Sequence, residues 1–308
     1  MRIVFLGSGA FGLPTLQALR EHEVAAVVSQ PDKPAGRGMK LTPTPIAQWA
    51  AEHLTNVPLF KPADVNEASV RDAVRAMQVD AWVVIAFGQK LSEALLADRF
   101  AINLHASLLP RWRGAAPINA AILAGDTVTG NSVITLAQRM DAGLVLGQST
   151  RPILPSQTAG ELHDLLAADG PALVLEVLRQ RASGTLQPVT QDEPKVTKAR
   201  KLSKDDGRLD FTQPASVLRC KVHGLTPWPG VTVTMGELAM KVLRVAEATG
   251  AANGTPGVIV DAAKGVVACG GGTALQLLEV QPAGGKPMAW DAFVRGRGGV
   301  VQSGATLA

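Results

Sequence analysis

The chain has 308 residues, of which 46% are hydrophobic and 18% charged, and a formal net charge of +4, which fits a globular protein of two domains. No apolar run is long enough to cross a membrane, and the apolar start Ile3–Leu6 is too short for a signal peptide, so we expect a cytoplasmic protein without a membrane partner. Its two cysteines, Cys220 and Cys269, lie far apart, which excludes a disulfide framework and gives no metal-binding spacing.

Short apolar runs alternate with helical patterns over residues 1–180. The runs that indicate buried parallel strands are Ile3–Leu6, Val24–Ser29, Ala81–Phe87, Ala101–Leu104 and Ser132–Ala137. The helical patterns between them are Leu13–Glu21, Pro45–Glu52, Glu67–Met77, Ser92–Ala97 and Ile118–Ala124. This alternation predicts an α/β fold with a Rossmann-like, doubly wound parallel sheet, whose ligands bind beyond the carboxyl ends of the strands.

The pattern changes in the last third of the chain. A long helical pattern covers residues 158–181, and a basic stretch follows at residues 195–204. Later apolar runs, separated by turn residues, predict strands at Val231–Thr234, Ala239–Val245, Gly257–Asp261, Val266–Cys269 and Ala274–Val280. Five such strands favour a small β-barrel of the OB type, which commonly binds oligonucleotides. We therefore expect a first domain at residues 1–190, a basic linker at 191–208 and an OB-like domain at 209–308.

A dense polar cluster follows the expected strand Ala101–Leu104. Asn103 and His105 are two residues apart, so their side chains share one face of an extended segment. An amide donor beside an imidazole can stabilise an oxyanion and move a proton in the same place. A lone histidine is more often a hydrogen-bonded structural residue, but the polar cluster and the following Arg111 and Arg113 favour a functional one.

A glycine-rich turn after the first strand suggests a rival function. Gly7, Gly9 and Gly12 fit the dinucleotide-binding fingerprint, and Asp32 lies about 20 residues further on, which would suit an NAD-dependent oxidoreductase. Asp32, however, belongs to a loop rich in proline and glycine, and the polar cluster lies at a different strand end. We therefore favour glycines that serve tight turning and close packing.

The positive charge is concentrated in the last third of the chain. Residues 1–194 contain 16 Lys or Arg and 18 Asp or Glu, whereas residues 195–308 contain 14 and 8. A basic second domain favours a polyanionic partner such as RNA over a merely solvated surface.

Several motifs together resemble a known family. The run Asn103-x-His105-x-Ser-Leu-Leu-Pro-x-x-Arg113-Gly, followed by Asp141-x-Gly143, resembles the formyltransferases that use 10-formyltetrahydrofolate. The loop at residues 30–38 looks like the tRNA-contacting loop of the members that formylate methionyl-tRNA. Their linker and C-terminal domain resemble residues 201–210, 227–230 and 281–288. The resemblance covers essentially the whole chain.

The resemblance implies roles for individual residues. The catalytic trio is matched by Asn103, His105 and Asp141. The segment that holds the folate is matched by Ser107, Leu108, Leu109 and Pro110, and we also expect Phe87 and Gly88, in the segment Ala-Phe-Gly-Gln, to border the folate. A loop arginine that reaches the acceptor end of the tRNA is matched by Arg37, and the charges of Lys33 and Lys40 on the same loop suit contacts to phosphates there.

These matches imply transfer of a formyl group from 10-formyltetrahydrofolate to the α-amino group of methionyl initiator tRNA, for translation initiation, by a monomer that needs no metal. Asn103 and His105 are suited to donate hydrogen bonds to the formyl oxygen. Asp141, beside His105, would accept the departing proton directly or through water.

The sequence leaves other formyl acceptors open, and it departs from the family pattern at two places. Formyl transfer to a small amine, such as an amino sugar nucleotide or glycinamide ribonucleotide, is the alternative, with the oxidoreductase behind it. The 31–40 loop and the basic last third favour tRNA. Phe87 stands where the family commonly has Tyr, and the apolar Val145 and Leu146 replace a polar pair, which bears on contacts around the folate pocket.

Overall fold

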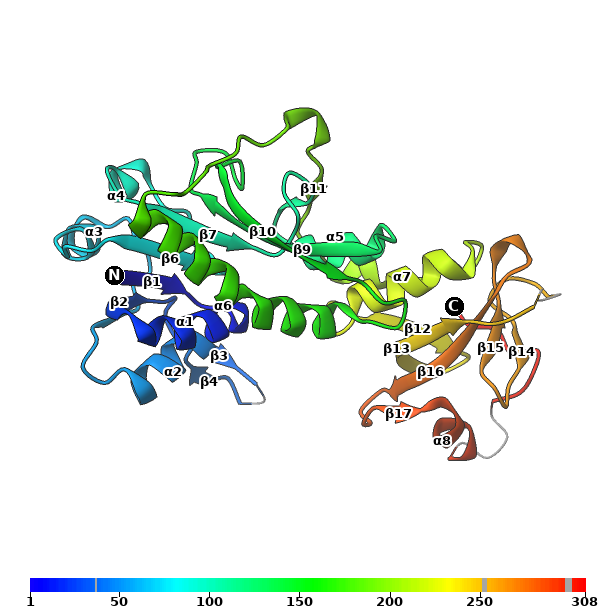
Figure 1. Ribbon diagram of the computed structural model, residues 1–308. Helices are drawn as coiled ribbons and strands as arrows, with labels where there is room; N and C mark the ends of the chain where they lie inside the picture. Colours follow the sequence, from blue (N-terminus) through cyan, green and yellow to red (C-terminus); the bar gives the residue numbers. More distant parts are fainter. Residues whose placement is uncertain (37, 251–253, 297–300) are drawn as a thin grey trace. The chain divides into compact units, whose positions relative to one another are not determined.

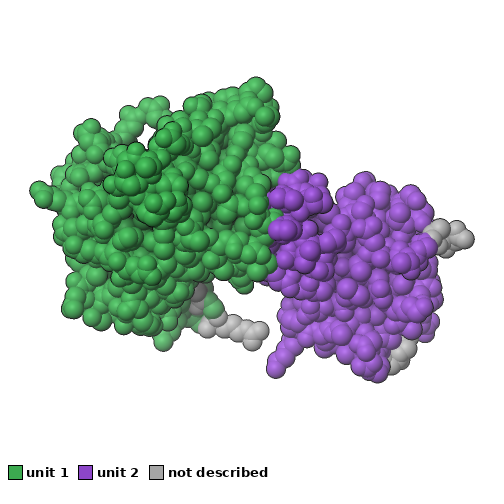
Figure 2. Space-filling view, in the orientation of Figure 1, with its two compact units in different colours: residues 1–114, 130–151, 163–198 green, residues 115–129, 152–162, 199–308 purple. Residues whose placement is uncertain are grey.

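The computed structural model describes residues 1–36, 38–250, 254–296 and 301–308. The chain forms two compact units, coloured separately in Figure 2. Unit 1 comprises residues 1–114, 130–151 and 163–198, and unit 2 comprises residues 115–129, 152–162 and 199–308. Two short segments from the first half of the chain therefore group with its C-terminal part. Within the described ranges, no helix is both long and apolar enough to cross a bilayer.

Unit 1 is built on a seven-stranded sheet with the order β10-β9-β7-β6-β1-β2-β5 (Figure 1). Its strands are β1 (Arg2–Gly7), β2 (Glu23–Val28), β5 (Leu59–Phe60), β6 (Ala81–Ile85), β7 (Ala101–His105), β9 (Val128–Thr135) and β10 (Val145–Pro152). β1 pairs in parallel with β2 and β6, β6 with β7, and β2 with β5. β1 and β6 are buried on both faces, as their continuous apolar runs predicted. The expected α/β fold with a parallel sheet is confirmed.

The edge beyond β7 differs from the prediction. The run at residues 132–137 was expected as a parallel strand, but β9 pairs antiparallel with β7, so that part of the prediction was wrong. The helix between the two strands, α5 (Pro117–Leu123), groups with unit 2 and does not act as a βαβ crossover over the sheet. β10 was not predicted, because its half-exposed residues alternate with polar ones and give no apolar run.

Five further helices surround or adjoin this sheet, and the predicted helical patterns correspond to them. They are α1 (Leu13–Ala18), α2 (Pro45–His53), α3 (Ala68–Arg75), α4 (Glu93–Leu96) and α6 (Ala159–Ser183). The α6 backbone closely approaches β7, because a Cβ added at Gly170 would lie 2.7 Å from Leu104 Cδ2. Since side chains alternate along a strand, Asn103 and His105 point to the face opposite α6.

Unit 2 is built on an antiparallel sheet with the order β12-β13-β16-β15-β14, with β17 paired to β16 (Figure 1). Its strands are β12 (Val231–Met235), β13 (Leu238–Glu247), β14 (Ile259–Asp261), β15 (Val266–Ala268), β16 (Ala274–Pro282) and β17 (Met288–Ala289). All five predicted strands are present, and the two-residue β17 is additional. The sheet is curled, as expected for a small OB-like barrel.

Residues 304–308 connect the two edges of this curled sheet. The amide of Leu307 donates to the carbonyl of Gly257, just before β14, at 2.8 Å. The backbones of Thr234 in β12 and Ala308 exchange two hydrogen bonds, at 2.8 and 2.9 Å. Because the side chain of Leu307 is buried in the core of unit 2, this segment joins the edges by both backbone pairing and apolar packing.

Two helices that were not predicted pack in unit 2: α7 (Ala215–Leu225) and α8 (Trp290–Arg295). α7 buries Leu218, Val222 and Leu225 in the core of the sheet. His223 on α7 is fully buried, and burial lowers its pKa to about 4. Its Nδ1 donates to the carbonyl of Pro155 at 3.0 Å, and its Nε2 accepts the amide hydrogen of Val245 at 3.2 Å. The neutral ring therefore fixes α7 to β13 and to the 152–162 segment.

Candidate active site

The candidate active site is built around a close approach between His105 and Asp141. His105 is the last residue of β7, at the carboxyl end of the strand, and it is 6% exposed. Asp141 lies in the loop between β9 and β10 with a left-handed φ of 53°. His105 Nδ1 lies 3.7 Å from Asp141 Oδ2, and the Asp141 side chain is 15% exposed. The fold thus brings together two predicted site residues that are 36 positions apart in the sequence.

Trp112 and the two-residue strand β8 (Arg113–Gly114) contact both of these side chains. His105 Nε2 lies 2.9 Å from the carbonyl oxygen of Trp112. Because a carbonyl oxygen only accepts hydrogen bonds, Nε2 carries the hydrogen, and Nδ1 is the ring nitrogen that faces Asp141. Two residues further on, the amide of Gly114 donates to Asp141 Oδ2 at 2.9 Å. Residues 112–114 therefore fix the orientation of both groups.

The side chain of Asn103 lies on the same face of β7 as His105 and is half-buried. Within the described part of the chain, no other residue hydrogen-bonds its amide group. Its backbone position is fixed between Val84 of β6 and Ile134 of β9. A rigidly placed amide with a free donor beside an imidazole can hold a carbonyl oxygen that gains negative charge.

The predicted folate segment, residues 107–110, is held by hydrogen bonds on several sides. Ser132 Oγ on β9 donates to the carbonyl of Ser107 at 2.6 Å and accepts the amide hydrogen of Leu109 at 3.0 Å. Gln148 Nε2 on β10 donates to the carbonyl of Leu109 at 2.9 Å. The peptide bond between Leu109 and Pro110 is cis. Leu108 is half-buried, while Ser107 and Leu109 are buried, so the segment forms a rigid bend directly after β7.

The other two predicted folate residues follow β6. The side chain of Phe87 is 2% exposed and belongs to the core on the α3 and α4 side of the sheet. Its carbonyl accepts hydrogen bonds from Ser8 Oγ and Gln30 Nε2, each at 3.0 Å. Gly88 has a φ of 81°, and a Cβ added there would lie 2.3 Å from Gln30 Nε2. At Phe87 and Gly88 the backbone, rather than the Phe87 ring, therefore borders the carboxyl end of β6.

The predicted tRNA-contacting residues lie on a β-hairpin that the sequence did not predict. Its strands are β3 (Lys33–Ala35) and β4 (Lys40–Thr42). Lys33 and Lys40 are exposed, and Lys33 Nζ donates to Gln30 Oε1 at 2.8 Å. Arg37 lies outside the described residues. The exposed side chains of Met39 and Leu41 accompany the two lysines on this hairpin.

The glycine-rich turn is structural. The amides of Ser8 and Gly9 both donate to the carbonyl of Ala86, at 3.3 and 3.2 Å, so they are not directed at a bound pyrophosphate. A Cβ at Gly7 would lie 2.5 Å from a ring carbon of Phe5, which shows that the glycine permits close packing. Asp32 forms an ion pair with Lys61 at 2.9 Å. These contacts remove the features on which the oxidoreductase hypothesis rested.

Sequence reasoning missed four residues that support the site: Ser132, Gln148, Gln191 and Thr197. The last two lie inside the expected linker, residues 191–208. Thr197 Oγ1 accepts the amide hydrogen of Trp112 at 2.9 Å, and Gln191 Nε2 donates to the carbonyl of Asp141 at 2.7 Å. Each of these residues lies at least sixteen positions from the group that it holds, and no local motif marks it.

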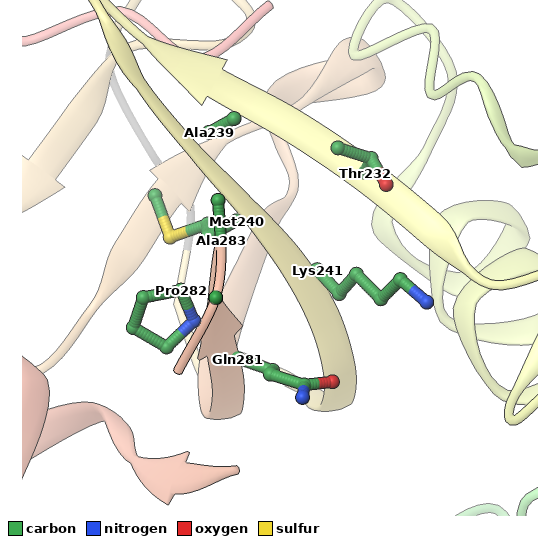
Figure 3. A pocket seen from close by; sticks show the side chains of 8 residues that line it. Thr232, Ala239, Met240, Lys241, Gln281, Pro282 and Ala283 are labelled. Atoms are coloured by element: carbon green, nitrogen blue, oxygen red, sulfur yellow. The ribbon is translucent and has the colours of Figure 1, made fainter. Parts of the chain in front are cut away.

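A separate cavity of about 220 Å³ lies on unit 2 (Figure 3). It is bordered by β12, β13, the end of β16 and the turn that follows, through Thr232, Ala239, Met240, Lys241, Gln281, Pro282, Ala283 and Gly284. None of the predicted catalytic or folate residues lines it. Among the described residues, no three His, Cys, Asp or Glu side chains converge on a common point where a metal ion could bind.

Comparison with known proteins covers nearly the whole chain. Residues 1–178 match the family described as formyl transferase, and residues 201–298 match its C-terminal domain. The chain is 42% identical over 296 residues to a methionyl-tRNA formyltransferase of Pseudomonas paraeruginosa, covering 94% of each chain. It is also 42% identical over 299 residues to the enzyme of the same name from Methylococcus capsulatus, covering 96% of each.

Solved structures with low sequence identity share the fold. An N-formyltransferase from Helicobacter canadensis, in complex with folinic acid and dTDP-3-aminofucose, superposes with a TM-score of 0.67 at 12% identity, over 89% of this chain and 98% of that one. HypX from Aquifex aeolicus, in complex with tetrahydrofolic acid, gives a TM-score of 0.63 at 18% identity, over 96% of this chain and 47% of that one. From its two matched domains and its identity to curated relatives, the chain belongs to the formyl transferase family and, within it, to the methionyl-tRNA formyltransferases.

Proposed function

We propose that this enzyme transfers a formyl group from 10-formyltetrahydrofolate to the α-amino group of methionyl initiator tRNA, for translation initiation. The observation that carries the proposal is the His105–Asp141 pair beside the free amide of Asn103 at the carboxyl end of β7. The relatives that are 42% identical over nearly their full length carry the name of this activity.

The co-substrate supplies an activated formyl carbon, and the protein must hold it against the end of β7. Ser107, Leu108, Leu109 and Pro110 are the proposed walls of its site, together with the backbone at Phe87 and Gly88. Support comes from the hydrogen bonds of Ser132 and Gln148, which make the 107–110 bend rigid before any ligand arrives. A preformed bend avoids an ordering cost on binding.

Asn103 is the proposed donor to the formyl oxygen. When the amino group attacks the formyl carbon, this oxygen gains negative charge and needs a fixed hydrogen-bond donor. His105 was expected to share this task, but its Nε2 hydrogen is directed at the Trp112 carbonyl. The amide of Asn103 is therefore left as the donor, with no competing partner among the described residues.

His105 and Asp141 are the proposed proton acceptors. The attacking nitrogen must lose a proton, and Nδ1 is the ring nitrogen free to take it. The resulting imidazolium would face the Asp141 carboxylate across 3.7 Å, which stabilises its positive charge. As the intermediate collapses, the bond between the formyl carbon and N10 breaks, and tetrahydrofolate leaves with the proton that His105 returns to N10. Asn103 thus stabilises the negative charge, and His105 with Asp141 the positive charge, that develop during transfer.

The acceptor end of the tRNA is proposed to meet the β3–β4 hairpin through Lys33, Lys40 and Arg37. The basic residues of 195–308 would contact the phosphate backbone, since such contacts position a nucleic acid without reading its sequence. The proposal also includes a catalytic domain at residues 1–190, a basic linker at 191–208 and an OB-like tRNA-binding domain at 209–308. We further propose that the enzyme works as a cytoplasmic monomer.

The test is a comparison of acceptors at equal 10-formyltetrahydrofolate. Methionyl-tRNA, an amino sugar nucleotide and glycinamide ribonucleotide are each incubated with the enzyme, and kcat/KM is measured for each. We expect formylation of methionyl-tRNA to exceed the other two by several orders of magnitude. A higher kcat/KM for either small amine would contradict the proposed acceptor while leaving formyl transfer intact.

A further inference from the structure

Gln191 joins two backbone segments that hold the Asp141 carboxylate. Its side chain is 7% exposed and lies in unit 1, within the segment expected from sequence to be a linker. Nε2 donates to the carbonyls of Asp141 and Gly143, at 2.7 and 2.8 Å. Oε1 accepts a hydrogen bond from Arg113 Nε at 2.9 Å. Both amide hydrogens and the amide oxygen are therefore used.

The first of these segments is the turn that carries Asp141. A non-glycine residue in the left-handed region is strained, and it persists only where its surroundings determine it. The two hydrogen bonds from Gln191 bracket this turn at residues 141 and 143. They hold the backbone from which the carboxylate projects.

The second segment is Arg113–Gly114. Arg113 is buried and forms an ion pair with Glu193 at 2.8 Å, so it is fixed on the same side as Gln191. The next amide, that of Gly114, donates to Asp141 Oδ2. One side chain thus connects the backbone that carries the Asp141 carboxylate to the backbone that binds it.

We infer that Gln191 is a positioning residue, which sets the Asp141 carboxylate against His105 and affects formyl transfer only through Asp141. This inference rests on the proposed function of the site. Gln191 is uncharged and contacts no proposed substrate group, so its loss should lower kcat and leave both KM values nearly unchanged. The effect of replacing Gln191 should also disappear in a variant whose Asp141 carboxylate has been removed.

Two substitutions separate positioning from general stability. Gln191→Glu keeps an oxygen that can accept from Arg113 but loses both donors to the 141–143 carbonyls. Gln191→Met has a similar size, no charge and no donor. The matched controls are Gln187→Glu and Gln187→Met, because Gln187 is exposed and lies only four positions before Gln191.

The first readout is steady-state formylation of methionyl-tRNA in two backgrounds. We expect both Gln191 variants to lower kcat by about 10- to 100-fold, since a shift of about 1 Å in a catalytic group can cost 100-fold. In an Asp141→Asn background the same changes should lower kcat by less than about threefold. Equal losses in the two backgrounds, or no loss in the wild-type background, would overturn the inference.

The second readout does not need activity. Hydrogen exchange at the Gly114 amide reports its bond to Asp141 Oδ2, and it should be faster in the Gln191 variants than in the Gln187 controls. Unchanged exchange would contradict the inference, as would unfolding of both Gln191 variants, because a general stabilising role then suffices. If the wild-type chain did not formylate methionyl-tRNA, the exchange result would still decide the role of Gln191, and only the proposed function would fail.

Discussion

His105 Nδ1 and Asp141 Oδ2 lie 3.7 Å apart, and each side chain is held by a backbone group of the same three residues, 112–114. The carbonyl of Trp112 orients the imidazole, and the amide of Gly114 orients the carboxylate. The separation of the pair therefore depends on this one segment of the chain, Trp112 followed by the strand β8. That segment is in turn fixed by Thr197, which lies more than 80 residues further along the chain.

Substitution of His105 should remove most of the activity. Without the imidazole, the proton of the attacking nitrogen loses the acceptor that lies next to Asp141, and general-base catalysis of this kind is worth about 10²–10⁴ in rate. We expect His105→Ala to lose that factor in kcat and to keep its far-UV circular dichroism spectrum. Near-normal turnover by this variant would rule out the assigned role.

Asn103→Ala should lower kcat by about 10²–10³, the usual cost of removing one donor to a developing oxyanion. Asn103→Asp tests whether the donor matters, because it keeps the shape of the side chain and presents only acceptors at neutral pH. Both variants should be similarly slow. If Asn103→Asp retained full activity, the oxygen would have to be stabilised by another group.

The affinity for tRNA should fall steeply with salt. Each phosphate contact adds about one unit to the slope of log K against log salt concentration. Lys33→Ala and Lys40→Ala should each weaken binding and reduce the slope by about one. Arg71→Ala on α3 serves as the control with the same loss of charge, and it should change neither quantity. If the affinity of the wild type for tRNA did not change with salt, the basic residues of the β3–β4 hairpin and of 195–308 would be excluded as the tRNA-binding surface.

The stability of unit 2 should depend on pH through His223. Its pKa is lowered to about 4 in the folded state, so the unfolded chain binds the proton more readily. The contribution of neutral His223 to the free energy of unfolding is therefore fully present above pH 6.5, the ordinary histidine pKa. This contribution is lost as the pH falls toward 4. The loss is on the order of 3 kcal/mol in the free energy of unfolding.

Denaturant unfolding of the wild type and two variants checks this prediction. His223→Gln should be less stable at neutral pH and should lack most of the change between pH 6.5 and pH 4. His53→Gln, at an exposed histidine, should keep the wild-type dependence. The same pH dependence in all three proteins would assign it to other groups.

Apolar runs in the sequence predicted most of the strands, both those buried on two faces and those buried on one. The continuous apolar runs of β1 and β6 define strands covered on both faces, and the five runs after residue 230 define the curled sheet. β10 was not predicted, because it lies at the edge of its sheet and its polar residues alternate with half-buried ones. The antiparallel direction of β9 was not predicted either. It depends on how the chain connects β7 to β9 through α5, and the residue pattern of a strand does not indicate this.

The candidate site shows the same division. Asn103 and His105 could be recognised because they lie two residues apart at a strand end. Asp141 was found through a family resemblance, since only the fold places it beside His105. Gln191 could not be recognised at all, because a buried glutamine has no distinctive spacing and acts on a carbonyl 50 residues away.

The most direct measurement is the identity of the amino acid on the tRNA after reaction. Initiator methionyl-tRNA is incubated with the wild-type chain and 10-formyltetrahydrofolate, the ester bond is hydrolysed, and the released amino acid is analysed by mass spectrometry. The account predicts N-formylmethionine with the wild type and almost none with His105→Ala. Unmodified methionine from the wild type, under conditions where the folded protein binds both substrates, would contradict it.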